Sequence, residues 1–149
     1  MWPALDPDTL ARLPQEVLHG SPLNLDRNSE LRIAEAWKEC FDALLATRML
    51  EDDWDGQGSP APAPELVDSA IILAVLLRQK NVKPPCHTVQ CVQGGVNFHW
   101  QWPDNVTFEI DVMEPYMADV FLLRPNQPCP YWQFGNGVAV PIIVSADDM

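Results

Sequence analysis

The spacing of apolar residues changes once along this chain, near Cys86, from the spacing of helices to that of strands. Before Cys86, apolar side chains recur every three or four residues in two segments, 29–50 and 64–80, which predicts two amphipathic helices. After it, apolar and polar residues alternate in 96–102 and 106–112, as they do in half-buried strands. Helices first and strands later predict an α+β fold, with two main helices packed on one face of an antiparallel β-meander of about five to six strands.

The register of the central hairpin follows from parity, because residues that face each other across two strands share one face of the sheet. The predicted turn is 103–105, with Asn105 in the left-handed conformation. The cross-strand pairs of this register are Phe98–Ile110, Trp100–Phe108, His99–Glu109 and Asn97–Asp111. We expect further strands at 88–92, 118–123 and 138–144, the last after a turn at 135–137.

At 149 residues the chain fits one domain with its own core. We expect residues 1–28 to form an irregular leader that packs on the body, and residues 29–149 to form a single α+β domain. No apolar run reaches the roughly 18 residues of a membrane helix, and the first residues lack the basic and apolar regions of an export signal. These features predict a cytoplasmic protein whose cysteines are free, mostly buried thiols.

The charge of the chain points to a class of partner. The formal net charge is −12, with 9 Lys and Arg residues in all. Affinity for phosphate groups comes from Lys and Arg, so this composition argues against direct binding to nucleic acid or to an anionic membrane. An acidic surface instead attracts basic surfaces. We therefore expect the partner to be another protein with a basic surface.

Acidic, aromatic and glycine residues are densest between the two predicted helices, in the segment 53–60. We interpret three of them as structural. The ring of Trp54 fills the gap between helices and sheet, while Gly56 and Gly58 adopt positive φ.

The same loop matches a calcium site in part. Asp53, Asp55 and Gln57 stand at the first ligand positions of an EF-hand-like loop. The match fails at position twelve, where Pro64 replaces the bidentate Glu. We therefore predict no metal here.

Two other groups of residues match chemical sites incompletely. His99 opposite Glu109 resembles an acid–base pair, but no Ser or Cys nucleophile with an orienting group accompanies it. A zinc site would need scattered residues without a C-x-x-C pair: Cys86, His87, Cys91, His99 and Cys129. We predict no catalytic residue, no metal and no cofactor, and we lean towards a protein that is not an enzyme.

Two groups of residues are the predicted partner-binding residues. The first is an acidic knot at a helix end, where negative charge opposes the helix dipole: Glu51, Asp52, Asp53 and Asp55. The second is a set of aromatic residues near strand ends, which favour binding at an exposed edge: Trp102, Tyr131 and Trp132. Alternatively, the acids form a solvated helix end and the aromatic rings cover the open end of the sheet.

Three elements of the chain resemble a family of small, uncharacterised bacterial proteins. They are a Trp-Asp-Gly-x-Gly-x-Pro loop at 54–60 between two helices, a Gly-Gly-Val-x-Phe-x-Trp strand at 94–100, and a Phe-Glu-Ile strand at 108–110. The resemblance spans roughly residues 44–112. It implies the fold predicted above and no catalytic residues, because the family has no established activity. Members often carry Ser where the second helix is capped, and Ala63 stands in that area here.

These observations favour a non-enzymatic acidic protein–protein interaction module, a partner or regulator of another bacterial protein, for example in a defence or toxin-type system. Inhibition of a nucleic-acid enzyme by mimicry of phosphate charge is a sharper form of this hypothesis. One alternative is a small-ligand-binding protein or enzyme that uses a cleft near the Trp54 loop. A further alternative is a structural subunit of a larger assembly.

Overall fold

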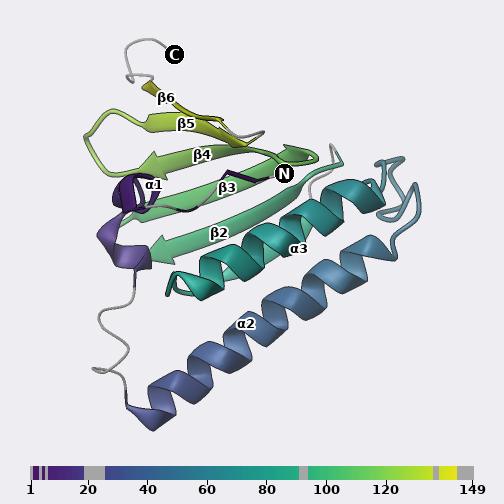
Figure 1. Cartoon of the computed structure of the whole chain (residues 1–149). Coiled ribbons are helices and arrows are strands. Elements are labelled where there is room, and N and C mark those ends of the chain that lie inside the picture. Colours follow the sequence, from purple (N-terminus) through teal and green to yellow (C-terminus); the bar gives the residue numbers. More distant parts are fainter. Residues whose placement is uncertain are drawn as a thin grey trace.

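The computed structural model describes residues 2–3, 5, 7–18, 26–90, 94–135 and 138–143, without the side chains of 89–90, 130–131 and 138–143. The helical elements are α1 (Pro7–Ala11), the 3₁₀ turn η1 (Gln15–Val17), α2 (Arg27–Arg48) and α3 (Pro64–Gln79). The strands are β1 (His87–Gln90), β2 (Val96–Trp102), β3 (Val106–Glu114), β4 (Met117–Leu123), β5 (Pro130–Gly135) and β6 (Val138–Ile143). This arrangement of helices and antiparallel strands confirms the predicted α+β class (Figure 1).

The described strands form one sheet in chain order, each antiparallel to its neighbour, so the sheet is a meander. The predicted register of β2 and β3 is confirmed pair by pair, and Asn105 in their turn has a φ of 59°. The expected turn at 135–137 lies mostly outside the described residues, as does Val144 at the predicted end of the last strand. The largest fully buried side chains include Trp100, Phe98, Phe108, Leu44 and Leu73.

Helices α2 and α3 lie side by side on one face of the sheet (Figure 1), α2 against β1 and α3 against β2 and β3. Helix α2 begins at Arg27 rather than at residue 29, because the Asp26 carboxylate caps it by accepting a hydrogen bond from the Ser29 backbone N–H (2.6 Å). Pro64 stands at the start of α3, where a missing N–H costs no helical bond. None of the helices described is long and apolar enough to cross a membrane.

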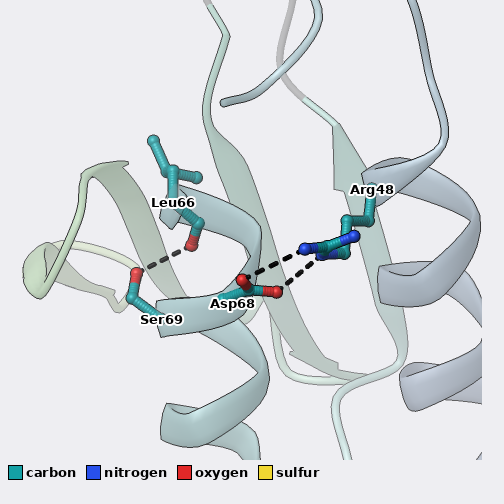
Figure 2. A network of polar contacts seen from close by, with 4 residues as sticks. All are labelled: Arg48, Leu66, Asp68 and Ser69. Carbon is teal, nitrogen blue, oxygen red and sulfur yellow. Dashed lines mark hydrogen bonds and ion pairs between the residues drawn. The ribbon is translucent and has the colours of Figure 1, made fainter. Parts of the chain in front are cut away.

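The two helices are also joined at their polar surface, as Figure 2 shows. Arg48 in the last turn of α2 contacts Asp68 of α3 through two bonds, Nε to Oδ1 at 2.7 Å and Nη2 to Oδ2 at 3.4 Å. The neighbouring Ser69 is buried and donates to the Leu66 carbonyl (2.7 Å), so its hydroxyl is satisfied within α3. Because the Arg48–Asp68 pair is exposed to solvent, it orients the helix ends more than it stabilises them.

The described residues of the leader contact the body at two places. The Trp2 ring is 5% exposed and stacks on Phe134 of β5, with ring centroids 5.6 Å apart. Its Nε1–H donates to the Ser69 carbonyl of α3 (2.7 Å). Farther along the leader, both carboxylate oxygens of Glu16 accept hydrogen bonds from Arg124 at 3.0 Å. The leader therefore connects α3 with β5 and with Arg124 after β4. This half of the sheet is the one that α2 and α3 leave open.

Candidate functional site

The loop between α2 and α3 is held together by its own carboxylates. Asp53 Oδ1 accepts a hydrogen bond from the Gly58 N–H (2.6 Å). Asp55 accepts one from the Gln57 N–H (2.9 Å) and one from the Ser59 hydroxyl (2.5 Å). The Ser59 hydroxyl bond is the main cause that lowers the pKa of Asp55. These oxygens, which the calcium hypothesis would need as ligands, already accept hydrogen bonds from the loop.

The aromatic and glycine residues shape the same loop. Trp54 is half-buried and its Nε1–H donates to the Pro60 carbonyl (3.1 Å). Gly56 and Gly58 have φ values of 73° and 79°, the left-handed conformation that the sequence predicts. A methyl group on Gly94 would lie 3.6 Å from Cγ of Pro60, so the loop lies against the turn that precedes β2.

The structure separates the two groups of predicted partner-binding residues. The loop that carries the acidic knot lies, through Pro60, beside the turn before β2, and Asp52 of the knot accepts a hydrogen bond from the Ala61 N–H (3.0 Å). Trp102 is partly buried at the other end of β2. The rise per residue of a strand places it about 20 Å from the start of β2. Trp132 is 8% exposed and its ring centroid lies 6.4 Å from that of Phe108, so it belongs to the core and not to an exposed patch. The side chain of Tyr131 lies outside the described part of the structure.

The face of the sheet opposite the helices is acidic, and the described strands contain no Lys or Arg. Arg124 is the only Lys or Arg after Lys83 in the whole sequence, and none of the 9 lies in a strand. Because buried and half-exposed residues alternate in β3 and β4, their odd-numbered side chains point away from the helices. Three of these side chains carry negative charge and form what we call the acidic face: Glu109, Asp111 and Asp119.

Within the acidic face, Asp111 of β3 stands directly opposite Asp119 of β4. The Asn97 amide of β2 donates to Asp111, and the Gln133 amide of β5 donates to Asp119 at 3.2 Å. Burial raises the pKa of Asp111, and the charges of Glu109 and Asp119 raise it further against the opposing effect of the Asn97 bond. Like charges directly opposite each other destabilise a sheet, so this pair is costly to the fold.

A hollow of about 140 Å³ opens beside this pair, and we call it the acidic hollow: it is lined by Asp111, Met113, Glu114, Met117, Asp119 and Gln133. Its shape depends on a β-bulge. Val112 pairs with Ala118 and Glu114 pairs with Met117, so β3 carries one extra residue, Met113, at this point. Bulges bend a strand and redirect side chains, and they are frequent beside functional sites.

The predicted His99–Glu109 contact is present, with 2.8 Å between Nδ1 and Oε1. The ring of His87 lies next to it, 6.1 Å from that of His99. Among the described contacts of this pair there is no Ser hydroxyl or Cys thiol, and the nearby Cys86 thiol bonds instead to the Gln101 carbonyl (3.8 Å). The pair is therefore a cross-strand contact on the solvent side of the sheet.

A larger cleft, of about 420 Å³, lies between α2 and β1, and its lining includes Glu39, Cys40, Cys86 and His87. The Cys40 thiol is buried, accepts a hydrogen bond from the Thr88 hydroxyl (3.3 Å), and has a pKa raised by burial. A protonated thiol is a poor nucleophile. Within the described ranges, which omit Cys91, no three His, Cys, Asp or Glu residues are placed to hold a metal. Cys40, which is buried, and Cys86, which is exposed, are free thiols.

Sequence reasoning placed Asp111 on the solvent side of the sheet but did not single it out, and it missed Asp119 and the two methionines of the acidic hollow. The signal available in the sequence was the near absence of Lys and Arg after Lys83. Comparisons with models of protein families, with curated proteins and with solved structures found no match to this chain.

Proposed function

We propose that this protein is a non-enzymatic interaction module that binds a basic surface of another protein, and so regulates it, through the face of its sheet opposite the helices. One observation supports this most directly. Asp111 and Asp119 face each other on a sheet whose strands contain no Lys or Arg. Such a face attracts positive surfaces and repels phosphate groups. A cationic partner would relieve the repulsion that the isolated protein bears.

The position of the acidic knot supports the same proposal. Its loop contacts the turn before β2 through Pro60 and Gly94, and a methyl group on Gly95 in that turn would lie 2.8 Å from the Val112 carbonyl of β3. Figure 1 shows the α2–α3 loop and the turn between β3 and β4 at the same end of the molecule. The acidic knot and the acidic hollow therefore give this end a concentrated negative charge.

The test is the affinity of a purified complex. The tagged protein is used to isolate its partner from the native host at low salt, and binding of the purified pair is measured by isothermal titration calorimetry. The double variant Asp111→Asn/Asp119→Asn keeps the shape of both side chains and removes their charge. We expect it to weaken binding by about tenfold or more, because each charge would face a cation in the complex.

The matched control is Glu30→Gln/Glu35→Gln, which removes the same charge from exposed positions on α2. We expect near-normal affinity for this variant. If both double variants weakened binding equally, the affinity would depend on the net charge of the protein and not on the acidic face. Failure to obtain any stoichiometric partner at low salt would overturn the interaction module itself.

A further inference from the structure

We propose that the acidic hollow receives a single arginine side chain from the basic partner, an inference that rests on the function proposed above. The size of the hollow limits its occupant. Its volume of about 140 Å³ is well below the roughly 300–1,000 Å³ of pockets that take drug-sized ligands and cofactors. One long side chain, entering from a docked protein surface, is the occupant that this size suits.

The polar side of the hollow matches a guanidinium group. Side chains directly opposite on neighbouring strands have Cβ atoms about 4.5–5.5 Å apart, so Asp111 and Asp119 present two carboxylates at the spacing of one fork of donors. Asn97 and Gln133 hold these carboxylates from the flanking strands β2 and β5. A guanidinium carries five N–H donors in one plane and can bond to both acids at once.

The apolar side of the hollow distinguishes arginine from lysine. Met113 and Met117 give it flexible, polarisable walls that adapt to an aliphatic stem and to a flat cation. Asp111 is half-buried, so the occupant must lose part of its hydration. A guanidinium is more weakly hydrated than an ammonium. The hollow should therefore prefer arginine, whereas charge alone would accept both.

Short peptides test this preference without the partner. The probes are Ac-Gly-Arg-Gly-NH₂, its Lys analogue and its citrulline analogue, the last being an uncharged isostere of arginine. Each is titrated at low salt into the ¹⁵N-labelled full chain, and amide shifts are followed by NMR. We expect the Arg peptide to shift residues 111–119 and 133, to bind about tenfold more tightly than the Lys peptide, and the citrulline peptide to give no shift there.

Two matched substitutions in one strand place a cation inside or outside the hollow. Met117→Lys puts an ammonium in the hollow itself. Leu123→Lys makes the same change of charge on the same strand and face, at a side chain that is 45% exposed and does not line the hollow. We expect Met117→Lys to abolish the shifts caused by the Arg peptide and Leu123→Lys to preserve them. The NMR spectrum of each variant verifies its fold.

The outcomes separate this inference from the proposed function. Equal binding of Arg and Lys peptides, or shifts elsewhere on the surface, would overturn the arginine site even if the partner complex depends on Asp111 and Asp119. Arg-selective shifts that Met117→Lys abolishes would establish the site. If the partner then bound the Asp111→Asn/Asp119→Asn variant normally, the proposed function would fail although the hollow accepts arginine.

Discussion

At the scale of single residues, the carboxylates have two opposite effects on stability. Asp55 accepts hydrogen bonds from Ser59 and from the loop backbone, which lower its pKa, so its charge supports the loop. Burial raises the pKa of Asp111, and Glu109 and Asp119 raise it further, so its charge opposes the fold. Substitutions at these two positions should therefore change stability in opposite directions.

Asp111→Asn should raise the free energy of unfolding at pH 7 by about 0.5 kcal/mol, the scale of a like-charge cross-strand pair. The folded state binds the Asp111 proton more tightly than the unfolded state does, so the cost of ionisation applies above the folded pKa. It disappears as the pH falls towards about 3.9, the unfolded value. Urea unfolding of both proteins at pH 7 and pH 4 should show the gain shrinking. A variant less stable at pH 7 would show that the bond from Asn97 outweighs the repulsion.

Asp55→Ala should have the opposite effect and lower the thermal midpoint at neutral pH. The lowered pKa of Asp55 means that its stabilisation is present above the unfolded value of about 3.9 and is lost as the pH falls through the folded pKa. Thermal unfolding at pH 7 and pH 2.5 should show a deficit that narrows in acid. Glu51→Ala, at an exposed position beside the same loop, is the control and should change little. An equal deficit at both pH values would assign the effect to loop shape instead of charge.

Substitutions at two glycines distinguish the cost of backbone strain from the cost of a steric collision. Gly58 has a φ of 79° and open space around it, so Gly58→Ala should cost only about 1 kcal/mol, the price of a left-handed conformation. In Gly95→Ala the methyl group would collide with the Val112 carbonyl, 2.8 Å away, and with Met113. We expect this variant to be clearly less stable in urea unfolding and also to lose affinity for the Arg peptide, because Met113 lines the acidic hollow. Equal stability of the two variants would contradict this ranking.

At the scale of elements, local patterns predicted most of the fold. The helices α2 and α3 follow from apolar spacing, and the β2–β3 register follows from parity and the Asn105 turn. Strand β5 was missed because its proline and aromatic residues suggested an edge patch. Trp132 and Phe134 lie two residues apart and both face the core, which is the alternation of a strand.

The candidate site was harder to predict than the fold. Asp111 and Asp119 become partners only through the register of β3 with β4, and that register includes the bulge at Met113. Parity assigns each side chain to a face of the sheet, but it does not locate an extra residue in a strand. The acidic knot was visible because its acids are neighbours in sequence, whereas the acidic face is assembled from two strands.

The leader is an element whose contribution can be measured. Trp2→Ala should lower the free energy of unfolding by about 3–5 kcal/mol, because it empties a large core position. Trp2→Phe keeps an aromatic ring against Phe134 and removes the hydrogen bond to Ser69, so it should cost less. Urea unfolding of the three proteins gives both values. A loss below 1 kcal/mol for Trp2→Ala would mean that the leader does not hold the open half of the sheet.

At the scale of the whole molecule, the strands differ from the rest of the chain in the charges that they carry. The basic residues lie in the leader, the helices and the connections, and the strands carry acids alone among the fully charged residues. A basic partner that docks on the strands therefore meets no Lys or Arg there. We expect its association rate to fall steeply between low and physiological salt while its dissociation rate changes less, as stopped-flow measurements can establish. If the association rate of the Asp111→Asn/Asp119→Asn variant depended on salt in the same way, the acidic face would not be the source of the attraction.

The stacking of Trp2 on Phe134 also bears on how the chain folds during synthesis. These rings meet across nearly the whole length of the chain, with the Ser69 carbonyl as a further anchor. Trp2 leaves the ribosome long before Phe134 does, so it has no docking surface until β4 and β5 have formed. Contacts of such high sequence separation slow folding, since distant segments must be ordered together. An apolar segment made early thus waits for its partner strands before it can be buried.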